Sequence, residues 1–390
     1  MSESGNYKIT AKDKEFVASI VADPDDDTIR LVYADWLEEQ GRQDRADFIR
    51  AQIELSTPPQ PRSKTRRRNL TRMTKNLWEK HGERWHKEPG GGDEKIFTEW
   101  GSSSNFHLWE RGFFARNYVR TMKEQLAELP ELVKKAPIQY LDVADSRRAD
   151  VARLIKLSIL QQMKGITLFC SSFEDELKIS DKEIAKLVKC PYLTRLEKLD
   201  LTQHDIGAEG IRLISHADTM PNLCELHMYG NNWTDEGLQI LAESPLASRL
   251  RYLHVSGVTA KGVRNFVKAP ALKNLKVLKF DNADVRDSGA KAIAKSPHLF
   301  GLTELWLHMC EINDAGIIAI ANSPHLTNLE YLDITSNWTV GHAAAVALVE
   351  SPYMKGLQKL DMWRCEGLSA EDERMLRNRF RSRVNFGRSY

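Results

Sequence analysis

The stretch "LTELWLHMCEINDAGIIAIANSP", residues 302–324, decides the fold. Its first part places Leu at every second or third position, "LTELWL", which predicts a short strand with one buried face. Its second part begins at Asp314 and repeats Ile and Ala at helical spacing. The Ser323-Pro324 pair that follows ends this helix. The stretch therefore predicts one strand followed by one helix within fewer than thirty residues.

The same pattern recurs along the second part of the chain. Units open at Leu196, Leu223, Leu250, Leu275, Leu302, Leu329 and Leu357, with spacings of 27, 27, 25, 27, 27 and 28 residues. Two weaker copies open at Ile138 and Met163, and the longer step from 163 to 196 predicts an insertion around 171–180. A doubly wound α/β fold is the alternative, but it predicts irregular spacing.

One strand and one helix cannot bury both of their apolar faces alone, whereas stacked copies can. We therefore expect an α/β solenoid of about nine units over 136–390, with a parallel sheet on the concave side and the helices outside. The array resembles leucine-rich repeats with a full helix in each unit. The last unit, "EDERMLRNRFRSRVNF" (371–386), is expected to form a capping helix with no strand after it.

Residues 1–56 predict a small module of three short helices. The run "IRLVYADWLEEQGRQDRADFIRAQIEL" (29–55) resembles the repeat-companion domain, found on many leucine-rich repeat proteins of planctomycete-type bacteria. Blocks at 77–88, 109–120 and 136–143 are similar to the rest of that architecture, so the resemblance covers nearly the whole chain. It implies no catalytic residue and no cofactor. The chain departs from the pattern in its arginine run at 66–68 and its insert at 88–104.

Aromatic and charged residues gather in the N-terminal module. Tyr33 and Trp36 share the expected inward face of the second helix, whereas Asp35 and Glu38 fall off that face. Arg45 and Arg50 on the third helix are expected to pair with these carboxylates. The structural interpretation is an aromatic anchor ringed by surface ion pairs, and the alternatives are a docking surface or a catalytic cluster. Catalysis is disfavoured because no His or second buried carboxylate is near Asp35 in sequence.

Charge is unevenly distributed, although the net charge is only +2. Residues 62–87 carry ten Lys and Arg against two acids, and residues 374–390 carry six Arg and no acid. We expect 57–135 to be a basic helical linker and N-terminal cap. Its basic run is either a solvated helix face, a polyanion-binding patch for nucleic acid, or a contact for an acidic protein. The candidate polyanion-binding residues are Arg66, Arg67, Arg68, Arg72 and Lys75.

The repeat also assigns side chains to the open face of the sheet. Counting the opening Leu as position one, positions three, five and seven of each unit are expected to face outward from the concave strands. Large aromatic residues at such positions are typical of protein-binding surfaces. The candidate partner-binding residues are His227, Tyr229, Tyr252, His254, Lys279, Trp306, His308, Tyr331 and Trp363.

Motifs for chemistry are missing from the sequence. It has no phosphate-binding loop, no nucleophile elbow and no H-E-x-x-H. The five cysteines are widely spaced, which predicts reduced thiols and a cytoplasmic location rather than a zinc site. No apolar run is long enough to span a bilayer, and we expect no secretory signal. The expected function is a recognition scaffold for a protein partner, with no catalytic residues, metal, cofactor or small-molecule substrate.

Overall fold

The computed structural model describes residues 9–56, 63–91, 104–121, 129–172 and 174–387. The chain divides into two compact units. Unit 1 comprises residues 1–144 with 162–166, and unit 2 comprises 145–161 with 167–390. Most of the predicted insert at 88–104 lies outside the described residues. The predicted domain boundaries after residues 56 and 135 stay predictions.

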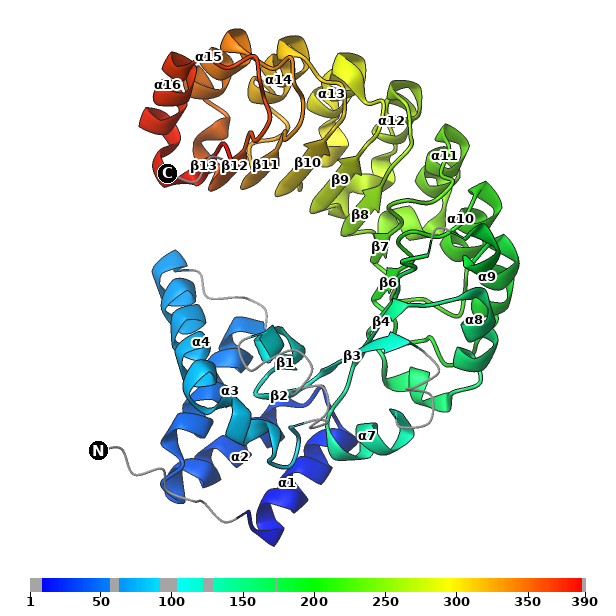
Figure 1. Ribbon diagram of the computed structural model, residues 1–390, viewed down its shortest axis with the longest axis vertical. Coiled ribbons are helices and arrows are strands. Elements are labelled where there is room, and N and C mark those ends of the chain that lie inside the picture. Colours follow the sequence, from blue (N-terminus) through cyan, green and yellow to red (C-terminus); the bar gives the residue numbers. More distant parts are fainter. Residues whose placement is uncertain (1–8, 57–62, 92–103, 122–128, 173, 388–390) are drawn as a thin grey trace. The chain divides into compact units, whose positions relative to one another are not determined.

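Unit 1 opens with helices, as the sequence predicted (Figure 1). The Thr10 hydroxyl and the Asp13 carboxylate form a capping box at the start of the first helix, and the Asp26 side chain caps the second. A short hairpin and further elements follow. The elements are α1 (Ala11–Ala22), α2 (Asp27–Glu39), α3 (Gln43–Ser56), α4 (Lys64–His86), η1 (Ser104–Leu108), β1 (Trp109–Glu110), β2 (Phe113–Phe114), β3 (Arg116–Thr121), α7 (Leu129–Lys135) and β4 (Tyr140–Asp145).

The charged residues of the helical module lie in two different environments, one at the surface and one buried. Arg50 lies at the surface, where its guanidinium contacts Asp35 at 2.5 Å and Glu38 at 2.6 Å. The prediction that Arg45 also pairs with these carboxylates is wrong. Arg45 is 1% exposed, and its guanidinium carbon lies 5.0 Å from the Trp85 ring centroid.

Arg45 is buried among aromatic side chains. These rings supply apolar surface that three short helices lack. The guanidinium carbon of Arg45 also lies 5.1 Å from the centroid of Trp109, and its Nε is 3.9 Å from Glu88. Burial lowers the pKa of Arg45 to about 10. The neighbouring Arg42 donates to Asp13 at 2.5 Å and to Glu88 at 3.0 Å. This geometry supports the structural interpretation of the charged cluster.

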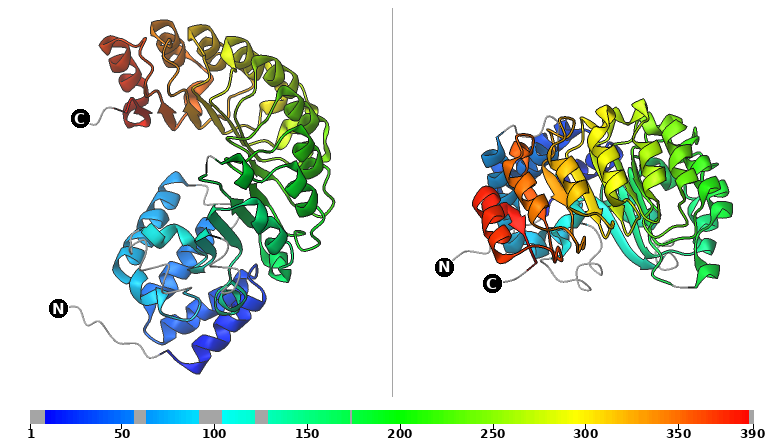
Figure 2. Two further views of the ribbon diagram at one scale, coloured as in Figure 1. Left: turned by 45° about the vertical axis from the view of Figure 1, so that its right-hand side comes forward. Right: turned by 90° about the horizontal axis from the view of Figure 1, so that it is seen from above.

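Unit 2 repeats a strand and a helix, with the strands lining the inner side of its arc and the helices the outer side (Figures 1 and 2). Strands β4 and β5 fall on the two weaker copies. The elements after β4 are α8 (Arg148–Leu154), η2 (Ser158–Gln162), β5 (Gly165–Leu168), η3 (Asp175–Leu177), α9 (Asp181–Leu187), β6 (Lys198–Asp200), α10 (Ala208–Ser215), β7 (Glu225–His227), α11 (Asp235–Glu243), η4 (Pro245–Ser248), β8 (Tyr252–Val255), α12 (Ala260–Phe266), η5 (Pro270–Asn274), β9 (Val277–Asp281), α13 (Arg286–Lys295), η6 (Pro297–Leu299), β10 (Glu304–His308), α14 (Asp314–Ala321), β11 (Tyr331–Asp333), α15 (His342–Glu350), η7 (Met354–Gly356), β12 (Lys359–Asp361), α16 (Ala370–Phe380), η8 (Arg381–Arg383) and β13 (Val384–Asn385).

The strands from β6 to β13 are hydrogen-bonded in chain order and parallel, which confirms the predicted solenoid. Equivalent leucines pair across the sheet, as Leu278, Leu305 and Leu332 do, and all three are fully buried. The register therefore keeps every unit in the same phase. In the described residues, no helix is both long and apolar enough to cross a membrane.

Side-chain hydrogen bonds also join each repeat of the solenoid to the next. The Asp287 carboxylate accepts hydrogen bonds from the backbone of Asn313 and Gly316, at 2.9 Å each. In three units the Ser of the repeated Ser-Pro pair donates to a carbonyl of the preceding unit, as Ser323 does to Ala294. These bonds satisfy backbone groups at helix ends that would otherwise have no partner.

The last unit differs from the prediction. A two-residue strand, β13, follows helix α16 and pairs in parallel with β12, Val384 opposite Leu360. The expectation that no strand follows this helix was wrong. Without β13, the backbone of β12 would be an open sheet edge, and an extended segment that reaches such an edge gains hydrogen bonds, even without the leucine pattern.

Asn337 gives a test of the ties between units. It is 1% exposed, and its Nδ2 donates to the carbonyls of Leu307 and Ile334 at 2.7 and 2.8 Å. Its Oδ1 accepts from the backbone of Cys310 and Ile312 at 3.2 and 3.0 Å.

Asn337→Ala should reduce the free energy of unfolding by about 2–4 kcal/mol, because it leaves several buried backbone groups without partners. Urea denaturation followed by circular dichroism measures the change. The matched control is Asn322→Ala, since Asn322 is exposed and its side chain donates one hydrogen bond, to the Ile318 carbonyl. Equal losses for the two variants would contradict this role of Asn337.

Candidate interaction surface

A continuous row of side chains crosses the open face of the sheet in unit 2. The strand register places position five of each unit beside position five of the next. Neighbouring parallel strands lie about 4.8 Å apart, so these side chains are direct neighbours on the face. We call this row, with positions three and seven beside it, the concave row. Position five reads, in order, Asp200, His227, His254, Lys279, Trp306, Asp333 and Asp361.

Two stacked histidine–tyrosine pairs form the first part of the concave row. The rings of His227 and Tyr252 stack with centroids 4.1 Å apart, and those of Tyr229 and His254 with centroids 5.3 Å apart. His254 Nε2 lies 2.7 Å from the Asp281 carboxylate. Burial lowers the pKa of His227 far below its ordinary value, so this imidazole is neutral at physiological pH.

Lys279 and Trp306 occupy the centre of the concave row. Lys279 Nζ lies 3.5 Å from the Trp306 ring centroid and 5.4 Å from that of Tyr252. Burial lowers the pKa of Lys279, although nearby carboxylates oppose this shift. Trp306 meets Tyr331 edge to face at 4.5 Å, and its Nε1 donates to Glu304 at 3.2 Å. These contacts hold the indole in one orientation while it stays half-buried.

Carboxylates surround Tyr331 at the far end of the concave row. Its hydroxyl donates to Asp361 and, at 3.3 Å, to Asp333. Burial and these hydrogen bonds raise the pKa of Tyr331, so it stays protonated. Lys359 Nζ lies 2.7 Å from Asp361 and 4.4 Å from the Tyr331 ring centroid.

The remaining predicted residues have fewer contacts. His308 is half-buried at position seven, opposite Asp281 in the register. Trp363 is 42% exposed, and a Cβ built on Gly387 would lie 1.8 Å from its ring, so the C-terminal segment packs against the indole. The Arg364 guanidinium lies 4.4 Å from the same ring centroid.

The structure brings aromatic faces, carboxylates and lysines into one row. Among the residues that the structure describes, no group of three or more His, Cys, Asp or Glu could hold a metal ion. All five cysteines are free and buried.

The predicted polyanion-binding residues lie on helix α4. Arg66 is engaged by Glu54, to which its Nε and Nη2 donate at 2.9 and 2.7 Å. Lys75 is exposed and lies 3.8 Å from Glu79. The side chains of Arg67, Arg68 and Arg72 are exposed to solvent.

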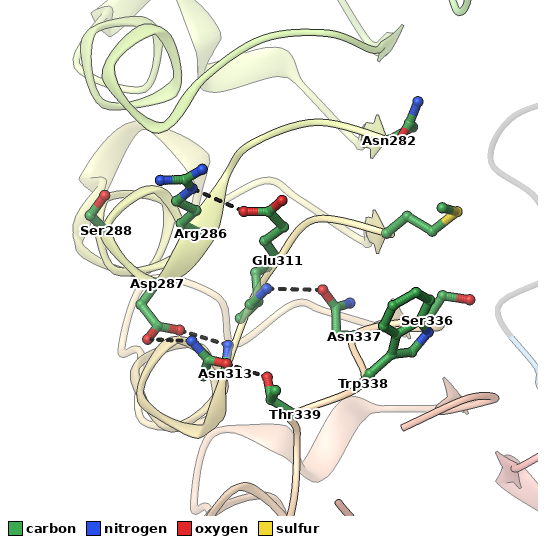
Figure 3. A pocket seen from close by; sticks show the side chains of 12 residues that line it. Asn282, Arg286, Asp287, Ser288, Glu311, Asn313, Ser336, Asn337, Trp338 and Thr339 are labelled. Carbon is green, nitrogen blue, oxygen red and sulfur yellow. Dashed lines mark hydrogen bonds and ion pairs between the residues drawn. The ribbon is translucent and has the colours of Figure 1, made fainter. Parts of the chain in front are cut away.

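A second surface was missed by the sequence reasoning. A pocket of about 830 Å³ lies where the chain leaves strands β9 to β11, and we call it the loop-edge pocket (Figure 3). Met309 and Trp338 line it and are 43% and 59% exposed. The Arg286 Nε to Glu311 Oε2 distance across its polar side is 3.1 Å.

The backbone beside the loop-edge pocket is strained. From the unit at Leu196 onward, position eight of each unit has a positive φ, and two units have glycine there, Gly230 and Gly257. Met309 adopts the same left-handed conformation with a φ of 51°, as do Asn282 and Ser336. The glycines at position eight were the signal in the sequence that could have revealed this turn.

Met309 offers a test of this strain. A left-handed residue with a Cβ costs about 1–2 kcal/mol, and glycine escapes that cost. Met309→Gly should therefore be more stable than Met309→Ala by about 1 kcal/mol in thermal or urea unfolding. At the exposed helical residue Lys291 the order should reverse, with Lys291→Gly about 1 kcal/mol less stable than Lys291→Ala. The same order at both sites would contradict the strained turn.

Comparisons with known proteins agree with the repeat geometry. A family model described as Leucine Rich repeat matches residues 192–215 and 325–349. No curated protein matches the sequence.

Two solved structures are similar in part. In the crystal structure of the Rad7 and Elc1 complex in yeast, one chain aligns at 16% identity and a TM-score of 0.46, over 65% of this chain and 62% of that one. An internalin from Listeria monocytogenes aligns at 20% identity and a TM-score of 0.37, over 57% of this chain and 54% of that one. The chain thus spans less than two thirds of either protein. Both scores are low, so the assignment rests on the repeat itself: the chain is a leucine-rich repeat solenoid preceded by a helical module.

Proposed function

We propose that this protein is a non-catalytic recognition scaffold that binds a protein partner through the concave row. The observation that carries the proposal is the central group of Lys279, Trp306 and Tyr331, whose rings and cation pack together on an open sheet face. Large aromatic side chains on such a face dominate the binding energy of protein interfaces. The row's own contacts hold its side chains in place before a partner arrives, which lowers the entropic cost of binding.

The wider organisation is part of the same proposal. We infer that residues 1–56 form a repeat-companion module of the planctomycete bacterial type, and that 57–135 link and cap the solenoid at 136–390. The protein acts in the cytoplasm, without cofactor or small-molecule substrate. The five buried free thiols support a reducing compartment.

Trp306→Ala tests the location of the binding site. The variant should lose about 2 kcal/mol or more of partner affinity, because the central anchor is removed. Wild type and variant are used to enrich proteins from a lysate of the native host, after nuclease treatment, and each retained protein is quantified. Thermal unfolding must show that the variant remains folded.

Two further aromatic variants serve as controls. Phe300→Ala removes a 55% exposed ring that is not on the concave row, and it should leave binding unchanged. Trp338→Ala removes the ring of the loop-edge pocket. If Trp338→Ala abolishes partner retention and Trp306→Ala does not, the site is the loop-edge pocket and the proposal is wrong.

A second candidate function rests on the exposed arginines of helix α4. Arg67, Arg68 and Arg72 point to solvent and are free to contact phosphates. An accessory nucleic-acid-binding role would use this patch together with the basic C-terminal residues 374–390.

Replacing Arg67, Arg68 and Arg72 with Glu tests this candidate. For duplex DNA, each lost phosphate contact lowers the salt slope by about 0.9, so the slope should fall by about 2–3. Binding is measured by fluorescence anisotropy over a salt series. The control replaces three exposed helical arginines of unit 2 with Glu: Arg153, Arg212 and Arg264. In this control the salt slope should fall by less. A wild-type protein that binds no DNA at low salt rules the candidate out.

A further inference from the structure

We propose that the partner presents a Lys- or Arg-bearing segment to the concave row, so that the face recognises a basic polypeptide. This inference rests on the proposed function and names the chemistry of the partner. Three independent features of the face support it: its charge balance, its use of rings to hold cations, and an unsatisfied carboxylate oxygen.

The charge balance of the face is negative. Positions three, five and seven of the seven units from β6 to β12 hold six carboxylates and three lysines. The three histidines at these positions are not included in this count. A basic segment is therefore attracted, and the phosphates of a nucleic acid are repelled. The carboxylates are Asp200, Glu225, Asp281, Glu304, Asp333 and Asp361, and the lysines are Lys198, Lys279 and Lys359.

The aromatic rings of the face already hold cations of this chain. Lys279 Nζ lies over Trp306 at 3.5 Å, and Lys359 Nζ lies over Tyr331 at 4.4 Å. An ammonium or guanidinium is attracted by the negative face of a ring, most strongly by Trp. The contacts show that a cation at this place has both a ring below it and carboxylates beside it.

One carboxylate of the face has hydrogen-bonding capacity left over. Within the part of the chain that the structure describes, Asp281 Oδ1 is buried and accepts no hydrogen bond. Its second oxygen contacts His254 at 2.7 Å. A buried acceptor without a donor is costly, and the N–H groups of an incoming guanidinium can relieve that cost after a small side-chain rotation.

Lys279 then has a specific role. It stands where the partner's cation is best placed, and its charge opposes that cation. Removal of the charge should therefore strengthen the binding of a basic segment. It should weaken the binding of an acidic one. The sign of the effect of one substitution thus reports the charge of the partner.

A random peptide library displayed on phage tests the inference without knowledge of the natural partner. The full-length wild-type protein and Trp306→Ala are used as parallel baits, and the peptides that depend on Trp306 are sequenced. These peptides should be enriched in Lys and Arg over the input library. One enriched peptide is then synthesised with a fluorescent label for anisotropy measurements.

Lys279→Met should bind this peptide about threefold more tightly or better, because a like charge is lost from the site. The matched control Lys291→Met removes one charge from the exposed face of helix α13 and should leave affinity unchanged. Circular dichroism shows whether each variant is folded. As a measurement on the wild type alone, affinity for the basic peptide should fall as salt rises.

The outcomes separate the two proposals. Peptides that depend on Trp306 but are acidic or neutral, a tighter peptide complex at high salt, or weaker binding by folded Lys279→Met overturn the basic-partner inference and leave the recognition function standing. If no peptide depends on Trp306, the concave row is not the binding site, and both proposals fail.

Discussion

A single strand–helix repeat of this protein leaves backbone hydrogen-bonding groups without partners. The bonds between successive repeats follow from that constraint. The strand has two open edges, and the helix leaves backbone groups without partners at its ends. Parallel pairing closes the edges, Asp287 serves the N-terminus of the next helix, and Asn337 bridges carbonyls and amides of neighbouring units. Because these bonds connect equivalent positions, unit lengths stay between 25 and 28 residues from Leu196 onward.

The same constraint creates the concave row. Once Leu278 and Leu305 pair in the core, Lys279 and Trp306 have to lie side by side on the open face. Their closeness removes water from both, which lowers the pKa of Lys279 and gives the indole a fixed place. A surface whose side chains are already ordered loses less entropy on binding than a surface of free side chains. The binding surface is thus a by-product of how the units stack.

The helical module has a small core, which is enlarged by aromatic residues from the rest of unit 1. Three short helices have little apolar surface to bury, and unit 1 adds Trp85, Trp109 and Phe113 around the guanidinium of Arg45. Arg42 links Asp13 to Glu88, residues that are far apart in sequence. Loss of one partner from such a buried pair is costly, because it leaves the other charge buried without a partner.

Sequence periodicity alone determined the solenoid, the phase of each unit and the face on which Trp306 and His254 lie, because the alternation of a strand is a local property. Only the tertiary structure decided what covers each residue. It buried Arg45 among rings while Arg50 stayed at the surface, it packed Gly387 against Trp363, and it added β13 to the open edge of β12. It also joined Met309 and Trp338, which come from two neighbouring repeats of the solenoid, in one pocket. Periodicity tells which way a side chain points, but burial depends on segments distant in the chain, and these leave no trace in the local pattern.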